Sequence, residues 1–168
     1  MPTQSQSSPS ISTERFYFSR DSRLLKHSSF EVVYKKGRRH FSHSMTFFYI
    51  LRPAAQKEAG PCSQQPASSR AQIGFTVGRV LGGSVERNRI RRRVREAVRH
   101  HLPPLKRALA ERSLSAEIVI NPKKSALKTD AAGLQSEVAR AFQAIAGAKS
   151  EDVARLSTPP GAASLPGK

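Results

Sequence analysis

Apolar residues recur with helical and strand periods along most of the chain, and they are sparse in three stretches. Those stretches lie near both ends and in the middle, and they consist largely of Ser, Pro, Gln, Gly and Ala. They offer too little apolar surface to offset the entropy of ordering. We therefore expect one domain at residues 20–147, a disordered N-terminal tail at 1–19, a flexible insert at 53–71 and a flexible C-terminal tail at 148–168.

Within the domain the hydrophobic spacing alternates between helix and strand. Phe30, Val33 and Tyr34 follow helical spacing, and Gly37 is placed to end that helix. The order of elements is typical of an α+β or α/β layer domain. The predicted elements are a helix at 28–36, an optional short strand at 38–43, strands at 45–51 and 72–77, a helix at 84–101 ended by Pro103-Pro104, a short helix at 105–112, a strand at 117–121 and a helix capped by Asp130.

The strand at 72–77 is predicted to have two unlike faces. Ile73, Phe75 and Val77 alternate with Gly74 and Thr76. Because successive side chains of a strand point to opposite sides, one face is apolar and the other is small and polar.

The net charge of the chain limits the classes of partner that it can bind. Its 168 residues include 29 Lys and Arg against 12 Asp and Glu, a formal net charge of +17, so we expect a polyanionic partner. No apolar run approaches the roughly 18 residues of a membrane-spanning helix, and the N-terminus lacks a signal-peptide pattern. The single cysteine, Cys62, excludes an internal disulfide. These features predict a soluble cytoplasmic protein with no membrane partner.

Much of the charge lies on the helix predicted from Ser84. Seven arginines and two glutamates occur between Glu86 and Arg99. At about 100° per residue, an apolar arc and a polar arc lie side by side on this helix. The apolar arc holds Ile90, Val94, Ala97, Val98 and His101; the polar arc holds Asn88, Arg91, Arg92, Arg95 and Arg99; the third side holds Arg89, Arg93 and Glu96, where Glu96 is spaced to pair with Arg92 or Arg93.

Three interpretations of this helix are open. A solvated charged face is the ordinary one, but donor-rich residues on one arc repel one another unless an anion lies against them. A basic amphipathic membrane helix would carry Trp, Phe or Leu on its apolar arc, and none occurs before Leu102. Phosphate binding is favoured, because arginine makes planar, bidentate contacts with phosphates. A second basic segment is Lys35-Lys36-Gly37-Arg38-Arg39.

No protein-borne catalytic site can be named from the sequence. A metal-dependent nuclease needs clustered carboxylates, and the three aspartates, Asp21, Asp130 and Asp152, are far apart. Histidines could hydrolyse RNA by acid–base chemistry. However, His100 and His101 are neighbours at the predicted helix end, a position that suits either a complement to the helix dipole or the edge of the core. We therefore predict no catalytic residue and no metal site in the protein.

The strand and helix that follow Gln72 resemble a known family. The motif is a strand before an arginine-asparagine-arginine core with further basic residues. It consists of Ile73-Gly74-Phe75-Thr76-Val77-Gly78-Arg79, Gly82-Gly83-Ser84-Val85-Glu86-Arg87-Asn88-Arg89-Ile90-Arg91-Arg92 and Arg95-Glu96-Ala97. This motif resembles that of the bacterial ribonuclease P protein component. Earlier and later segments also match, namely Arg23-Leu24, Phe30, Tyr34, Gly37 and Ile118-Val119-Ile120, so the resemblance extends from about Arg20 to Ile145, the whole predicted domain.

The resemblance implies a fold and a function. The fold is an α+β, two-layer α/β sandwich of order α-β-β-β-α-β-α, similar to a ribosomal protein domain, with a left-handed βαβ crossover. Sequence alone would favour the common right-handed connection. The function is that of the protein subunit, monomeric within the ribonucleoprotein, of the enzyme that removes the 5′ leader of precursor tRNA. The partners are then the catalytic RNA and precursor tRNA, and the RNA with its Mg²⁺ ions carries the chemistry.

The resemblance also assigns residues. Phe30 and Tyr34 would stack on leader bases in a cleft between the first helix and the sheet, with Gly74 as part of its floor, although core packing is an equal alternative for both rings. Arg93 stands where the family is often apolar, which suggests an additional exposed cation. The family often has two basic residues where this chain has Arg79-Val80. The expected RNA-binding residues are Arg87, Asn88, Arg89, Arg91, Arg92, Arg95, Arg99, Arg79, Lys35, Lys36, Arg38 and Arg39, and the expected leader cleft holds Phe30, Tyr34, Gly74 and Thr76.

Two other functions remain as alternatives. A structural RNA-binding module, such as a ribosomal protein, would use the same arginine helix without serving a nuclease. A protein-alone nuclease would cleave RNA in preparations free of any RNA subunit.

Overall fold

Three helices and one four-stranded sheet make up the described part of the chain. The computed structural model describes residues 18–54 and 71–148. The order α-β-β-β-α-β-α is the predicted one, and the optional strand is present as β1. The elements are α1 (His27–Lys36), β1 (Arg38–Phe41), β2 (Met45–Pro53), β3 (Ala71–Phe75), α2 (Ser84–Glu111), β4 (Leu114–Pro122) and α3 (Ala131–Gly147), with short 3₁₀ turns η1 (Arg20–Ser22), η2 (Arg79–Leu81) and η3 (Lys124–Leu127).

The sheet has the strand order β1-β2-β4-β3. β2 pairs antiparallel with both β1 and β4, whereas β3 runs parallel to β4. Parallel neighbours cannot be joined by a hairpin, and here α2 makes the connection from β3 to β4. The left-handed sense of this connection stays a prediction.

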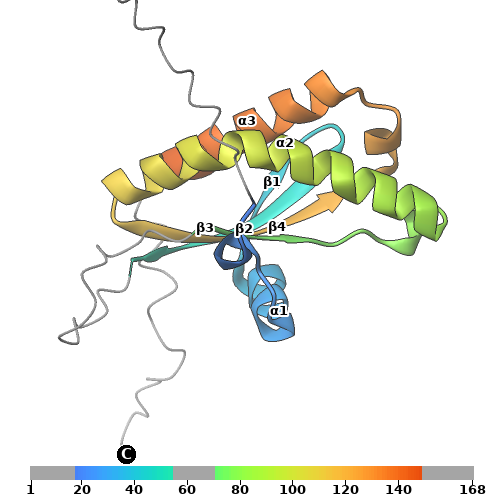
Figure 1. Ribbon diagram of the computed structural model, residues 1–168. Coiled ribbons are helices and arrows are strands. Elements are labelled where there is room, and N and C mark those ends of the chain that lie inside the picture. Colours follow the sequence, from blue (N-terminus) through green and yellow to red (C-terminus); the bar gives the residue numbers. More distant parts are fainter. Residues whose placement is uncertain (1–17, 55–70, 149–168) are drawn as a thin grey trace, which may run out of the picture.

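Helices cover the two faces of the sheet unequally. α2 and α3 lie together over one face, and α1 lies alone on the other (Figure 1). The alternation within β2 follows from this, because Phe47 belongs to the large core while Phe48 packs beside α1. We call the two sides the α2–α3 face and the α1 face.

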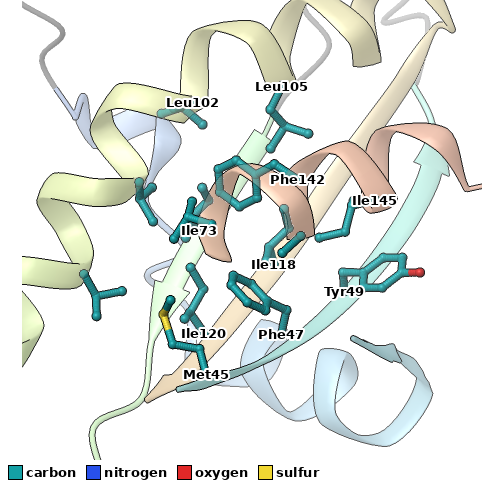
Figure 2. Packing of buried hydrophobic residues seen from close by; sticks show 14 of the residues in the cluster. Met45, Phe47, Tyr49, Ile73, Leu102, Leu105, Ile118, Ile120, Phe142 and Ile145 are labelled. Atoms are coloured by element: carbon teal, nitrogen blue, oxygen red, sulfur yellow. The ribbon is translucent and has the colours of Figure 1, made fainter. Parts of the chain in front are cut away.

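The α2–α3 face holds the main hydrophobic core. Phe47, Ile118 and Ile120 are fully buried there, and the ring of Phe142 from α3 meets Phe47 edge to face at 6.4 Å between centroids (Figure 2). The α1 face has a smaller cluster. Its buried members are Leu24, Val33, Ile50 and Val119, and Phe30, Val32, Tyr34 and Phe48 are partly buried against them.

The helix α2 is longer than the sequence predicts. Pro103 and Pro104 were expected to end it, and a separate helix was expected after them, but α2 continues to Glu111. Proline removes a backbone donor and usually breaks a helix. Here the buried stripe continues in register through Leu102, Leu105 and Leu109, so packing against the sheet offsets the lost hydrogen bonds.

Two helix ends are as predicted. The Oδ1 atom of Asp130 accepts a hydrogen bond of 2.9 Å from the backbone N–H of Gly133, which caps α3. Gly37 follows α1, and its N–H donates to the carbonyl of Val33 at 2.9 Å. A Cβ atom at Gly37 would lie 2.2 Å from that carbonyl oxygen, so only glycine fits this close approach.

The expected limits of the tails and insert need correction at six residues. Phe18 was assigned to the N-terminal tail but is buried, with its ring 5.9 Å from that of Phe75, and the hydroxyl of the next residue, Ser19, hydrogen-bonds to that of Ser22. Pro53 and Ala71 were assigned to the insert but belong to β2 and β3, and the N–H of Ala54 donates to the carbonyl of Ser113 at 2.8 Å. Ala148 was assigned to the C-terminal tail but packs against the core. The expected mobility of the remaining tail and insert concerns residues 1–17, 55–70 and 149–168, which lie outside the described residues. None of the helices that the structure describes is both long and apolar enough to cross a bilayer.

Candidate nucleic-acid interface

Three exposed arginines stand on the side of α2 that faces away from the core. The opposite side of the helix is anchored by the buried stripe that includes Ile90 and Val94. Arg89, Arg92 and Arg95 are exposed, and none of them makes a hydrogen bond or ion pair with another residue in the ranges 18–54 and 71–148. We call these three the arginine row. Their guanidinium groups retain all their donors for a planar, bidentate contact with an anion.

Other predicted members of the motif make hydrogen bonds within α2 or to the turn just before it. The Nη1 atom of Arg91 donates to Oδ1 of Asn88 at 2.9 Å, and Nη1 of Arg87 donates to the carbonyl of Gly82 at 3.0 Å. Arg87 and Arg91 are half-buried, and Asn88 is exposed. A guanidinium has five donors, so each arginine keeps capacity for an outside acceptor while its orientation is restricted.

Glu96 does not pair as predicted. The expected partners were Arg92 or Arg93, but its carboxylate accepts from Arg99, and its Oε1 atom lies 3.2 Å from Nε2 of His100. The pairing partly neutralises Arg99, and Arg92 makes no ion pair with any residue that the structure describes.

Arg93 is not the additional exposed cation that the sequence suggested. It is half-buried, and its guanidinium donates to the backbone carbonyls of Ala126, at 3.4 Å, and Thr129. These carbonyls belong to η3 and the loop before α3. Arg93 therefore ties α2 to this loop instead of presenting its charge to solvent.

The start of α2 is fixed by a local hydrogen bond and a glycine turn. The Oε2 atom of Glu86 accepts from the N–H of Gly83 at 2.8 Å. Gly82 has φ 114°, a conformation that other residues adopt only with strain. Arg79 and Val80, in η2 just before this turn, are both exposed.

On the α1 face, side chains fall into rows that cross the sheet. Residues directly opposite each other on neighbouring strands share a face. The inner row is Arg39, Phe48, Val119 and Gly74, and the outer row is Phe41, Thr46 and Asn121 with Thr76, whose N–H continues the ladder by donating to Ile120 O at 3.0 Å.

Aromatic rings and a cation meet around the inner row. The rings of Tyr34 and Phe48 are 4.8 Å apart and packed edge to face, and the guanidinium of Arg39 lies 5.3 Å from the Phe48 centroid. The hydroxyl of Tyr34 donates to Oδ1 of Asn121 at 2.9 Å. Sequence reasoning missed Phe48 and Asn121, although the alternation of β2 already places Phe48 opposite to the core residue Phe47.

The other predicted cleft residues occupy different environments. Gly74 is buried directly beneath Phe30, because a Cβ atom there would lie 2.5 Å from Cζ of that ring. Phe30 and Tyr34 are both half-buried, whereas Thr76 is exposed beyond the end of β3. The ring of Phe30 thus covers Gly74, and Thr76 remains accessible.

The second basic segment lies where α1 ends and β1 begins. Lys35, Lys36, Arg38 and Arg39 are all exposed. α1 covers one face of the sheet and α2 the other (Figure 1), so Lys35 and Lys36 of α1 and the arginine row of α2 belong to helices on opposite faces, whereas Arg38 and Arg39 belong to the edge strand β1. Arg39 lies beside an aromatic ring of the inner row, that of Phe48.

Potential metal ligands are not clustered among the described residues. Across residues 18–54 and 71–148, no three His, Cys, Asp or Glu side chains lie together in a way that could hold a metal ion. One histidine is perturbed: burial, and secondarily the charge of His100, lower the pKa of His101 below its ordinary value. His101 lies half-buried on α2 after the stripe residue Val98.

Comparison with known proteins identifies the family. A sequence model of the family described as Ribonuclease P matches residues 18–146, which includes every described helix and strand apart from the last residue of α3. The chain belongs to the ribonuclease P protein family.

Individual ribonuclease P proteins match parts of the chain. The ribonuclease P protein component of Acidothermus cellulolyticus is 35% identical over 96 residues, which cover 56% of this chain and 70% of that protein. For the component from Dictyoglomus thermophilum the identity is 33% over 91 residues, covering 54% and 64%. The solved RNase P protein from Thermotoga maritima has a TM-score of 0.51 at 19% identity, with 72% of this chain and 94% of that one covered, and shows that the fold is shared.

Proposed function

We propose that this protein is the protein subunit of a cytoplasmic ribonuclease P and assists removal of the 5′ leader from precursor tRNA. The observation that carries the proposal is the arginine row of Arg89, Arg92 and Arg95, exposed and unpaired among the described residues, on the motif helix of a ribonuclease P protein. A row of guanidinium groups on a helix anchored by its opposite side suits a polyphosphate backbone.

The arginine row is proposed to bind the catalytic RNA. Each guanidinium can take a phosphate in a bidentate contact, and the hydrogen bond from Arg91 to Asn88 orients two further polar groups along the same helix. Arg99 contributes less in this proposal, because Glu96 already accepts from it.

The α1 face is proposed to take the single-stranded 5′ leader. Unpaired bases expose their flat faces, and aromatic side chains bind them by stacking, while nearby cations contact the phosphates. Tyr34 and Phe48 supply half-buried rings, and Arg39 supplies the charge. Phe30 acts mainly as support, because its ring packs onto Gly74.

The chemistry is proposed to reside in the RNA subunit. Magnesium held by that RNA would activate the attacking water and stabilise the leaving oxygen. The protein, as a monomer within the ribonucleoprotein, would position the leader and neutralise phosphate repulsion.

Reconstitution tests this function. The full-length protein is mixed with a bacterial ribonuclease P RNA, and cleavage of precursor tRNA is measured at low magnesium. We expect the protein to raise the cleavage rate and the double variant Arg92→Gln/Arg95→Gln to do so less at equal concentration. A folded wild-type protein that gives no stimulation would contradict the proposal. Co-purification with ribosomal RNA instead would favour a structural RNA-binding module.

A further inference from the structure

The outer row of the α1 face ends at an aromatic side chain that is exposed to solvent. Phe41, the last residue of β1, has 67% of its surface exposed. It lies directly opposite Thr46 of β2, which in turn lies opposite Asn121 of β4. The ring therefore stands on the same face as Tyr34 and Phe48, at the edge strand of the sheet.

A lysine is held next to this ring. The Nζ atom of Lys123 lies 6.0 Å from the Phe41 centroid and donates to the carbonyl of Ser42 at 2.7 Å. Its backbone N–H donates to the carbonyl of Ser44 at 2.8 Å, so the end of β4 is joined to the β1–β2 turn. An ammonium group has three donors, and the contact with Ser42 leaves others for an anion.

The pair formed by Phe41 and Lys123 repeats the pair formed by Phe48 and Arg39. In both, a cation lies beside a ring on the α1 face, at 6.0 Å in the first and 5.3 Å in the second. Phe41 is two residues beyond Arg39, the direct partner of Phe48, so the two rings are diagonal neighbours with Cα atoms about 7–8 Å apart. Two ring-and-cation pairs at this spacing match successive nucleotides of a single strand, each with one base and one phosphate.

We propose that Phe41 and Lys123 form a further nucleotide-binding position, in which a base of single-stranded RNA stacks on Phe41 and its phosphate pairs with Lys123. The position extends the binding of the leader to the β1 edge of the sheet, and in that respect it rests on the proposed function. The local charge favours RNA over a protein partner, because the ring lies between the cations Arg39 and Lys123 and its neighbours on the outer row, Thr46 and Asn121, are uncharged.

The first test uses the full-length protein alone and a fluorescein-labelled oligouridylate of about ten nucleotides. By fluorescence anisotropy we expect Phe41→Ala to weaken binding by about 5- to 20-fold, the lower part of the range for loss of one stacked base. Phe41→Tyr should bind like the wild type because it keeps the ring. Leu25→Ala is the matched control, since Leu25 is also apolar and is 62% exposed, and it should bind like the wild type.

Lys123→Gln isolates the phosphate contact. We expect it to reduce the slope of log K against log salt by about 0.7, the value for one phosphate of a single strand. Unchanged binding by both Phe41→Ala and Lys123→Gln would overturn the proposal. Sedimentation of the wild type as a dimer, converted to a monomer by Phe41→Ala, would also overturn it, because the ring would then serve a second copy of the chain.

The second test uses the reconstituted enzyme and precursor tRNAs with leaders of increasing length. We expect Phe41→Ala to leave short-leader precursors unaffected and to weaken binding only once the leader reaches the β1 edge. Equal weakening of all precursors and of mature tRNA would overturn the leader assignment. If the wild-type protein fails to stimulate cleavage but the oligonucleotide test still depends on Phe41, the proposed function fails while the nucleotide position stands.

Discussion

Phe47 and Phe48 are consecutive residues of β2, and their side chains serve opposite faces of one sheet. Phe47 has none of its surface exposed and packs under α2 and α3, whereas Phe48 is half-buried beside Tyr34 and Arg39. The alternation of a strand makes this possible without any change of backbone. One face is closed by apolar packing, and the other presents rings and cations.

The difference arises from the helices that cover each face. α2 and α3 are 28 and 17 residues long and together bury the α2–α3 face, while α1 has 10 residues and packs on Ile50 and Val119 of the α1 face. The outer row therefore keeps exposed side chains at both of its ends, Phe41 and Thr76. Stability therefore comes mainly from the α2–α3 face, and leader binding is proposed for the α1 face.

Replacing each phenylalanine of β2 should separate stability from binding. Phe47→Ala removes a fully buried ring and should lower the free energy of unfolding by about 3–5 kcal/mol. Phe48→Ala should lower it by about 1–2 kcal/mol, since its ring is only half-buried, while weakening binding of single-stranded RNA. Urea denaturation followed by circular dichroism measures the first effect. Equal destabilisation by the two variants would show that the α2–α3 face and the α1 face contribute equally to stability.

Neutralising one arginine of α2 should weaken binding of the catalytic RNA. The packing on both faces of the sheet should stay as it is. Arg95→Gln should weaken RNA binding by about 1–2 kcal/mol and reduce the salt slope by about one unit at most, since it removes one phosphate contact. Arg107→Gln is the matched control, because Arg107 is exposed on the same helix but lies outside the motif. Measuring RNA binding by both variants from about 50 to 400 mM salt distinguishes the two arginines. Identical slopes of log K against log salt for the two variants would mean that Arg95 faces solvent and contacts no phosphate.

Arg93 should behave as a structural residue although it lies among the arginines that we propose to bind RNA. Arg93→Met removes the hydrogen bonds to the carbonyls of Ala126 and Thr129, so the free energy of unfolding should fall by about 1 kcal/mol with little change in salt slope. Arg89→Met should reduce the salt slope of RNA binding and leave the free energy of unfolding nearly unchanged. Thermal denaturation and salt titration of both variants make the comparison, and a reduced slope for Arg93→Met alone would contradict it.

The smallest expected effect is a pH dependence from His101. Its lowered pKa means that the unfolded chain binds a proton more readily than the folded one. Above the ordinary histidine pKa of about 6.5, His101 is neutral in both states and does not change the free energy of unfolding. As the pH falls from that value toward the lower pKa of the folded state, the unfolded chain takes up the proton first and the free energy of unfolding decreases. His101→Asn should show a shallower decline between pH 7 and 5 in urea denaturation than the wild type. A steeper decline would mean that His101 stabilises the fold when charged.

Local patterns in the sequence predicted the order of elements, the cap of α3 by Asp130 and the buried stripe of α2. Each of these depends on residues a few positions apart, such as Asp130 and Gly133. The spacing of Leu102, Leu105 and Leu109 also fits a continued α2, whereas Pro103 and Pro104 predict a helix end. Burial of a continuous stripe can override a local helix breaker.

Contacts between distant segments could not be predicted in this way. Arg93 reaches the loop before α3, and Arg112 donates to the carbonyls of Ala146 and, at 2.6 Å, Ala148 at the end of α3. Similarly, the inclusion of Phe18 in the core depends on its meeting Phe75. At the candidate site, the missing partners were Phe48 and Asn121. Their common face follows from the sheet register, but their contacts with Tyr34 depend on how α1 packs on that face.

We propose that the α1 face recognises the leader, and the decisive measurement is the ratio of the reconstituted enzyme's affinity for precursor tRNA to its affinity for mature tRNA. Tyr34→Ala should lower this ratio by about fivefold or more, because a stacking ring is lost, and leave mature tRNA binding unchanged. Tyr34→Phe, which loses only the hydrogen bond to Asn121, should keep most of the ratio. Equal loss of affinity for both RNAs in Tyr34→Ala would contradict the claim and place Tyr34 in a structural role.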